Sequence, residues 1–336
     1  MRSWTAGQNM IVTRTPLRVS FAGGGTDLST FFEKEEGVVF STTITQYVYV
    51  TVKRHSDLFF EPIRLNYSKS EEVDHVHEIE NNIARECLRF LDVGPPIYIS
   101  TVGDVPASTG LGGSSAFCVG LLNALHAFKG ERVSPGQLAE EASHVEIDIL
   151  GHPIGKQDQY AAAFGGFNVF CFKSDGGVTV EHQRFTDSLR QELFASMMMF
   201  WTGHQRDADS VLAEQKDNTE AEFARLRKMR DQARDLQVLA GNGHLDIKTF
   251  GRVLDEGWQL KRELASGITN QQIDELYDAG VRAGAYGGKL CGAGGGGFLL
   301  FIVPPDRQPA VQESMGALPR LAVGHEAHGS QVIVGG

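Results

Sequence analysis

The sequence lacks any long apolar segment. Its longest apolar runs, such as residues 298–303, are far shorter than the ~20 residues that a membrane-spanning helix requires. Its N-terminal region also lacks the basic, apolar and small-residue order of a secretory signal. The sequence therefore predicts a protein that has no membrane partner.

Cysteine is scarce as well. The four cysteines, Cys87, Cys118, Cys171 and Cys291, show no Cys-x-x-Cys spacing. This pattern does not suggest a disulfide framework or a zinc site. We therefore expect reduced thiols and a cytoplasmic location.

Basic residues are outnumbered, because 31 Lys and Arg face 42 Asp and Glu, for a net charge of −11. A general nucleic-acid binder needs a basic face to meet phosphates, so no nucleic-acid partner is expected. A small anionic ligand is not excluded, because a local pocket of Arg, Lys and backbone N–H groups can bind it.

The length of 336 residues suggests two domains, which we place at residues 1–187 and 188–336. Strands and helices mix without a regular alternation, which favours an α+β fold. Strands are expected at residues 10–21, 38–52, 97–102, 168–172, 178–185, 298–303 and 331–334. Helices are expected at residues 78–92, 114–128, 135–150, 207–239, 246–265, 270–284 and 307–316. A short helix is also expected to open within residues 27–36, with Thr26 or Asp27 as its cap.

Glycine is abundant, with 39 residues gathered partly in clusters at residues 22–27, 106–116 and 292–297. The second cluster follows a predicted strand and enters the N-terminus of a predicted buried helix. Free N–H groups and the helix dipole there favour an anion such as phosphate. The alternative is a flexible turn before a helix that Ser114 or Ser115 caps.

The standard nucleotide-binding motifs do not support a P-loop or a dinucleotide-binding site in this chain. The chain contains no Gly-x-x-x-x-Gly-Lys-[Ser/Thr] loop. Residues 292–297 match Gly-x-Gly-x-x-Gly, but they precede a predicted strand instead of opening a helix, so the dinucleotide-binding interpretation fails. Taken alone, this cluster predicts a tight turn that leads into a strand.

Two carboxylates stand out beside these clusters. Asp158 is either the N-cap of a helical turn at residues 161–164 or a carboxylate that takes a proton from a substrate hydroxyl. Glu146 lies at the edge of an apolar stripe, where it is either solvated or a magnesium ligand beside phosphate. The residues alone leave both alternatives open.

Three motifs in order resemble those of the GHMP small-molecule kinases. They are residues 15–27, residues 106–116 and residues 289–298, with Gly-Lys-Gln-Asp at residues 155–158 between the last two. The resemblance extends over nearly the whole chain. It implies the two-domain α+β GHMP kinase fold, with an N-terminal domain like ribosomal protein S5 domain 2, a ferredoxin-like C-terminal domain, and the active site between them.

The resemblance also implies roles for individual residues. Asp158 matches the catalytic aspartate, and Arg18 would keep it ionised and neutralise developing charge. Mg²⁺ would be held by Ser114 and Glu146. The ATP phosphates would be bound by the loop residues Pro106, Ser108, Thr109, Gly110, Leu111, Gly112, Gly113, Ser114 and Ser115. The third motif would support this loop.

Within the family, residues 18–28, 155–166 and 201–208 resemble the corresponding segments of bacterial D-glycero-D-manno-heptose 7-phosphate kinases. The expected reaction is therefore ATP-dependent phosphorylation of the anomeric hydroxyl to give the 1,7-bisphosphate, for the nucleotide-activated heptose of surface polysaccharide. The sugar would be bound by Gly24, Gly25, Thr26 and Asp27, and its distal phosphate by Lys156, Arg206 and Arg14. The partners are thus ATP and a sugar phosphate, and the chain is expected to act as a monomer or homodimer.

Two alternatives remain. The first is another sugar 1-kinase, acting on fucose or on an unphosphorylated heptose. The second is a catalytically silent sensor of nucleotide and sugar on the same fold. The basic helix predicted at residues 207–239 is either a solvated amphipathic face or a lid over the site.

Overall fold

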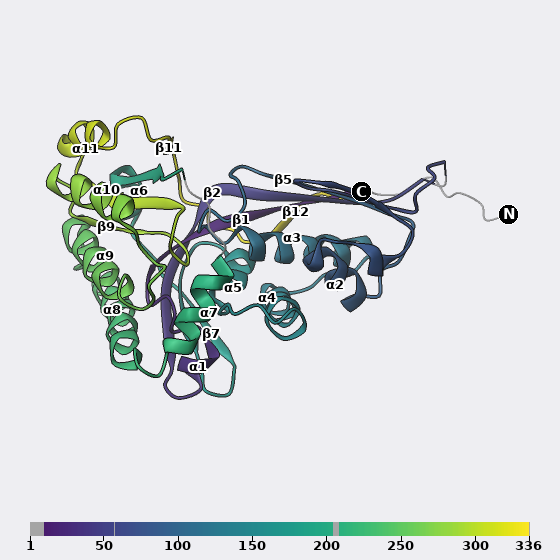
Figure 1. The fold of residues 1–336 in the computed structure, drawn as a ribbon, viewed down its shortest axis with the longest axis horizontal. Helices are drawn as coiled ribbons and strands as arrows, with labels where there is room; N and C mark the ends of the chain where they lie inside the picture. Colours follow the sequence, from purple (N-terminus) through teal and green to yellow (C-terminus); the bar gives the residue numbers. More distant parts are fainter. Residues whose placement is uncertain (1–9, 57, 204–207, 336) are drawn as a thin grey trace.

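The computed structural model describes residues 10–56, 58–203 and 208–335. Two sheets and their covering helices make up this part of the chain (Figure 1). The strands are β1 (Ile11–Ala22), β2 (Gly37–Arg54), β3 (Ile63–Asn66), β4 (Ser70–Val73), β5 (Ile97–Gly103), β6 (Phe167–Phe172), β7 (Val178–His182), β8 (Met197–Trp201), β9 (Gly287–Leu290), β10 (Phe298–Ile302), β11 (Arg320–Leu321) and β12 (Gln331–Val334). The α-helices are α1 (Ser29–Phe32), α2 (Asn82–Phe90), α3 (Gly113–Phe128), α4 (Pro135–Ser143), α5 (Gln157–Phe164), α6 (Asp187–Ser196), α7 (Ala208–Asn218), α8 (Phe223–Gly241), α9 (Ile247–Lys261), α10 (Gln271–Arg282) and α11 (Gln308–Ser314).

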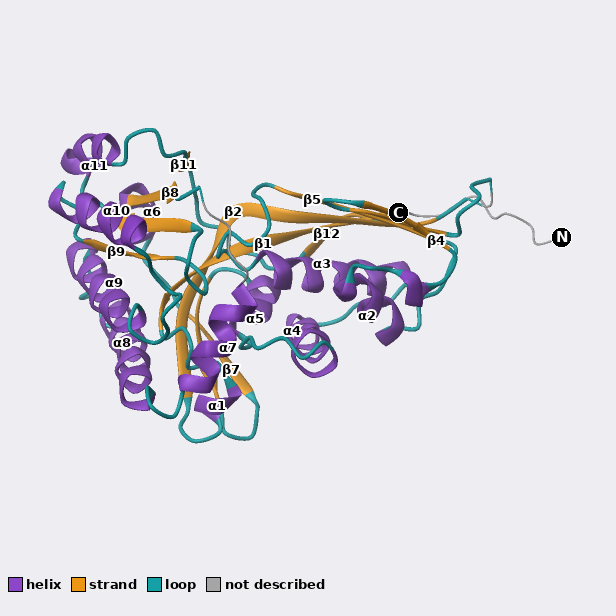
Figure 2. Cartoon of the chain, viewed as in Figure 1, coloured by secondary structure: helices purple, strands orange, loops and turns teal. Residues whose placement is uncertain are grey.

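The first sheet is built on the long antiparallel pair β1 and β2, which are rich in β-branched residues. Its strand order is β12-β1-β2-β5-β3-β4, and β6 and β7 extend from β2. Helices α2, α3, α4 and α5 lie along one side of this sheet (Figure 2). Helix α3 is apolar on nearly all sides and buried, as predicted.

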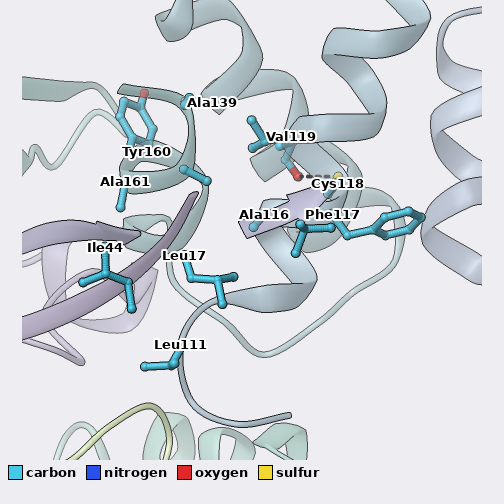
Figure 3. Packing of buried hydrophobic residues seen from close by; sticks show 14 of the residues in the cluster. Leu17, Ile44, Leu111, Ala116, Phe117, Cys118, Val119, Ala139, Tyr160 and Ala161 are labelled. Carbon is cyan, nitrogen blue, oxygen red and sulfur yellow. Dashed lines mark hydrogen bonds between the residues drawn. The ribbon is translucent and has the colours of Figure 1, made fainter. Parts of the chain in front are cut away.

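Helix α3 joins the layers of the first core. Leu17 of β1, Ala116 and Val119 of α3, and Ala139 of α4 belong to one packed cluster (Figure 3). Gly120 of α3 also lies directly against the sheet, since a Cβ there would come within 2.6 Å of the Thr15 hydroxyl. The middle of α3 is therefore packed closely against β1.

The second sheet has the order β11-β8-β10-β9 and is antiparallel. Trp258, Tyr277 and Phe301 are buried among the side chains that pack between it and helices α9 and α10. Strand β10 confirms the strand predicted at residues 298–303. Strands β3, β4, β9 and β11, each two to four residues long, were not predicted.

The C-terminal end of the described chain returns to the first sheet. Strand β12 pairs with β1, and His325 forms a bridge with Ile44 of β2. The division into residues 1–187 and 188–336 stays a prediction, and it did not include this return.

Three predicted helices differ in detail. Helix α1 has Leu28 at its N-cap and no side-chain cap, so the prediction of Thr26 or Asp27 as the cap was wrong. The helix predicted at residues 135–150 ends as α4 at Ser143 and continues as a π-helical segment, His144–Ile149. The helix predicted at residues 207–239 is divided into α7 and α8.

Three basic residues of α8 form ion pairs with carboxylates of the segment between α1 and β2. Arg227 and Arg230 pair with Glu35, and Arg234 pairs with Glu36. These partners follow α1 directly, so the basic face of α8 is an interface between two parts of the chain.

Candidate active site

A pocket with a volume of about 330 Å³ lies between the two sheets. Its lining combines the first and second glycine clusters, the start of α5, the π-helical segment, α7 and the turn after β9. The residues that line it are Arg18, Ser20, Gly24, Gly25, Asp27, Leu28, Ser108, Thr109, Gly110, Gly112, Gly113, Ser114, Ser115, Glu146, His152, Ile154, Gly155, Gln157, Asp158, Leu212, Gln215, Lys261, Lys289, Gly292 and Ala293.

The loop of the second glycine cluster leads directly into α3. Helix α3 begins at Gly113, and its N-cap Gly112 has a φ of +75°. No side chain caps the helix, so the interpretation of Ser114 or Ser115 as a cap was wrong. Residues from Ser108 to Ser115 line the pocket, with the exception of the buried Leu111. Pro106 does not line it. The uncapped N-terminus of α3 faces the pocket with the charge that suits a phosphate.

The third glycine cluster supports this loop. Gly110 and Gly292 touch so closely that a Cβ on either one would collide with the other segment. A Cβ on Gly297 would also come within 2.6 Å of the Thr109 carbonyl oxygen. Residues 292–297 therefore form the predicted turn into β10 and at the same time hold the loop from the second sheet.

Asp158 forms a bidentate ion pair with Arg18. Arg18 Nε and Nη2 each donate to one carboxylate oxygen of Asp158 at 2.7 Å, and Arg18 Nη1 donates to the Gly110 carbonyl at 2.7 Å. The side chain of Arg18 is 7% exposed and that of Asp158 is 24% exposed. Paired charged hydrogen bonds of this kind fix both groups in place. Because α5 begins at Gln157 with Lys156 as its N-cap, the interpretation of Asp158 as a helix cap was wrong.

Glu146 is fully buried beside the start of α3, so the interpretation of Glu146 as solvated was wrong. Its carboxylate accepts from the Ser114 hydroxyl at 3.0 Å and from Gln159 Nε2 at 2.7 Å. Burial raises the pKa of Glu146 to about 7, although hydrogen bonds from Ser115, Gln159 and Ser114 act to lower it.

The pair of Ser114 and Glu146 offers oxygen donors, which are the ligands that Mg²⁺ takes beside a phosphate. Magnesium bound to nucleotide commonly uses only one or two protein ligands, with the remaining positions filled by phosphate and water. A buried carboxylate whose charge is poorly compensated also suits a cation. The two residues therefore fit the predicted ion.

Asp27 is the third carboxylate at the pocket. Its Oδ1 accepts from the Gly25 N–H at 3.0 Å and from Gln157 Nε2 at 2.9 Å, and its Oδ2 accepts from the Gln157 N–H at 3.2 Å. Burial, together with the charge of Asp158, raises its pKa. The carboxylate is held next to Asp158 and lines the pocket with Gly24 and Gly25.

Thr26 does not reach the pocket. Its side chain is fully buried, and its hydroxyl donates to the carbonyl of Gly23 at 2.8 Å and of Val38 at 3.1 Å, and accepts from the Val38 N–H at 3.0 Å. The structure therefore gives Thr26 the role of shaping the turn that presents its neighbours.

Three cations were predicted to bind a distal phosphate. The two that the structure describes, Lys156 and Arg14, do not line the pocket. Lys156 Nζ donates to the Gly176 carbonyl and to Glu140. Arg14 contacts Gln331 and Glu326, at the β12 side of the first sheet. Arg206 lies outside the described residues.

Two lysines of the pocket were missed as functional residues. Lys289 stood at the start of the third motif but was treated only as part of it. Lys261 ends the amphipathic helix α9, where a lysine is usually solvated. Gln157, which holds Asp27, lies in the Gly-Lys-Gln-Asp stretch at residues 155–158 but received no role.

Comparison with known proteins agrees with this geometry. The chain matches the N-terminal domain of the GHMP kinases over residues 66–166 and their C-terminal domain over residues 238–320. It is 30% identical over 311 residues to the D-glycero-alpha-D-manno-heptose 7-phosphate kinase of Campylobacter jejuni, which covers 89% of this chain and 91% of that protein. It is also 26% identical over 336 residues to the galactokinase of Pyrococcus furiosus, which covers 91% of this chain and 92% of that protein.

The fold has close counterparts among solved structures. The crystal structure of a D-glycero-D-manno-heptose 1-phosphate kinase from Bacteroides thetaiotaomicron superposes with a TM-score of 0.78 at 26% identity, over 96% of this chain and 98% of that chain. Fold, pocket and relatives together define an ATP-dependent sugar kinase. The chain belongs to the GHMP kinase family.

Membrane insertion has no support among the described helices, since none is both long enough and apolar enough to cross a bilayer.

Proposed function

We propose that the protein transfers the γ-phosphate of ATP to the anomeric hydroxyl of D-glycero-D-manno-heptose 7-phosphate, which gives the 1,7-bisphosphate. One observation carries the proposal: Asp158, clamped by Arg18, lines the same pocket as Asp27 and the uncapped start of α3. The similarity to the Campylobacter jejuni heptose 7-phosphate kinase supports the choice of sugar.

In this mechanism, Asp158 accepts the hydrogen bond of the attacking hydroxyl and takes its proton as the new O–P bond forms, while the bond between the γ-phosphorus and the bridging oxygen breaks and ADP leaves with that oxygen. The bidentate contact with Arg18 keeps the carboxylate oriented, and the guanidinium adds positive charge beside the transferring group. The N–H groups at the start of α3 bind ATP phosphates, while Asp27 and the backbone of Gly24 and Gly25 bind sugar hydroxyls.

Ser114 and Glu146 would hold Mg²⁺. When bound, the ion offsets negative charge on the phosphates during transfer. Ser114 is placed for this by the first turn of α3, and Glu146 by the π-helical segment after α4. Glu146 would hold the cation as its carboxylate, and because its pKa is raised to about 7, binding of the cation would release a proton near neutral pH.

The test is magnesium-dependent release of ADP from ATP across a panel of sugars. The panel compares D-glycero-D-manno-heptose 7-phosphate, the free heptose, fucose, galactose and mannose. We expect turnover only with the 7-phosphate. Turnover on a free sugar would keep the kinase and reject this substrate, and ATP binding without turnover on any sugar would favour the sensor.

We also infer that the protein works in the cytoplasm, which holds ATP and reduced thiols. None of the four cysteines forms a disulfide in the described chain. Even Cys87 and Cys118, whose Sγ atoms lie 3.8 Å apart, remain thiols. Fractionation of cells that produce the protein tests this, and recovery from an oxidising compartment would contradict it.

A further inference from the structure

Two buried lysines line the pocket from the second sheet. Lys261 is the last residue of α9, and Lys289 lies in β9. The two residues are only 8% and 7% exposed. Both reach the pocket that holds Arg18 and Asp158.

Neither ammonium group has a carboxylate partner among the described residues. Lys261 Nζ donates to the Gly292 carbonyl. Lys289 Nζ donates to the carbonyls of Ser20 at 2.8 Å and Phe21 at 3.4 Å. An ammonium group has three donors, so Lys261 keeps two that none of these contacts uses.

Burial of a cation without a counter-ion costs free energy, and the neutral form is then favoured. Burial, with the charge of Lys289, lowers the pKa of Lys261 to about 7. Burial lowers the pKa of Lys289 to about 8. A dianion bound in the pocket would supply the missing negative charge for both.

The position of Lys261 is close to the reacting groups. Its partner Gly292 touches Gly110 of the phosphate loop. The charges of Arg18 and Asp158 both act on the Lys261 ammonium. An anion bound to Lys261 would therefore lie between the loop and the catalytic aspartate.

We propose that Lys261 binds a phosphate group of a substrate in this pocket, and that Lys289 adds a second positive charge behind it. The inference rests on the proposed function, in which ATP and a sugar phosphate share the pocket. Two phosphates can supply this chemistry: the γ-phosphate of ATP and the phosphate carried by the sugar. Binding and kinetics separate the two.

The test replaces Lys261 by methionine, which keeps the length and loses the charge. Lys248→Met is the matched control, because Lys248 is exposed on the same helix. Lys261→Arg keeps the charge. We expect kcat/KM to fall at least 30-fold in K261M, less than twofold in K248M, and less in K261R than in K261M. K261Q replaces K261M if thermal unfolding shows that the methionine variant does not fold.

The source of the phosphate follows from which constant changes. If the sugar supplies it, KM for heptose 7-phosphate rises while the KM and the binding constant for ATP stay unchanged. If ATP supplies it, kcat falls, or ATP binding weakens both in the presence and in the absence of the sugar. A folded K261M that matches K248M within twofold for both substrates would overturn the proposal.

Failure of the proposed function would look different. If the wild-type protein turns over no sugar, titration calorimetry still compares the binding of ATP and of heptose 7-phosphate to wild type, K261M and K248M. Weaker binding of either ligand to K261M alone supports the phosphate site. Equal binding to all three proteins overturns it.

Discussion

The two walls of the pocket treat charge in opposite ways. On the first-sheet wall, formed by Arg18, Asp27, Glu146 and Asp158, each charged group has side-chain partners at hydrogen-bond distance. On the second-sheet wall, formed by Lys261 and Lys289, the charged groups contact only backbone carbonyls among the described residues.

This difference gives the two walls different roles: one holds reacting groups in position, and the other binds a ligand. Paired groups are already in their working positions, so they orient reacting atoms at little further cost. Buried cations that lack a counter-ion instead gain their missing partner when an anion arrives. The first-sheet wall is therefore suited to the chemical step, and the second-sheet wall is suited to holding phosphate between the two sheets.

The largest effect is expected for Asp158→Asn on the first-sheet wall. The amide cannot take the proton of the attacking hydroxyl, so kcat should fall at least about 10³-fold while the binding constant for ATP stays within about threefold. Steady-state kinetics and ATP titration measure both. Asp235→Asn, at an exposed site on α8, is the control. A near-normal kcat in D158N would remove the proposed role of this wall.

Glu146→Gln should weaken activity and strengthen the free protein. We expect kcat to fall about 100-fold, because the proposed Mg²⁺ ligand loses its charge. The pKa of Glu146 is raised to about 7 in the folded state, against 4.5 for an ordinary Glu. Ionisation therefore destabilises the folded wild type progressively as pH rises from about 4.5 through 7.

The gain in stability from this substitution is on the order of 2 kcal/mol at pH 8 and should shrink at pH 5, where Glu146 is protonated in the folded protein. Urea unfolding of wild type and E146Q at the two pH values, without magnesium, measures the difference. A gap that is the same at both would contradict the buried carboxylate.

The charge of Lys261 should appear as a pH effect in the wild type. Burial and the charge of Lys289 lower the pKa of Lys261 to about 7, and Arg18 acts in the same direction. The charges of Cys291 and Asp158 act to raise this pKa. As pH rises above 7, the free protein loses this cation, so binding of the substrate phosphate should weaken by up to about tenfold per pH unit. The KM profile between pH 6.5 and 9 measures this, and an equally steep profile in K261M would contradict it.

The smallest effect is expected for Lys156→Ala, outside both walls. Its contacts are with Glu140, which is half exposed, and with the Gly176 carbonyl. Exposed pairs of this kind contribute about 0–1 kcal/mol to stability. We expect kcat and both KM values to stay within twofold. A tenfold rise in KM for heptose 7-phosphate alone would place the sugar's phosphate beside α4 instead of the second-sheet wall.

The first-sheet wall could largely be predicted from the sequence, because its residues lie in compact motifs. Asp158, Arg18 and Asp27 were recognised in those motifs, and the structure brings them to one pocket. The burial of Glu146 could not be predicted, since it depends on a π-helical segment that departs from ordinary helical spacing.

The second-sheet wall was harder to predict. Lys261 and Gly292 are far apart in the sequence and meet only when α9 packs near the turn after β9. Helical spacing places Lys261, unlike Lys248, on the apolar stripe of α9 with Leu254 and Trp258, but it does not reveal that the ammonium group meets the Gly292 carbonyl. Thr26 is the opposite case: the motif predicted that it binds the sugar, but its hydroxyl bonds to the backbone and shapes the turn.

The most direct test of the account is phosphorus-31 and proton NMR of the product formed from ATP and D-glycero-D-manno-heptose 7-phosphate. The account predicts one new sugar phosphorus signal coupled to the anomeric proton, with the 7-phosphate signal retained. A new phosphate coupled to any other proton, or no new sugar phosphate at all, would contradict it.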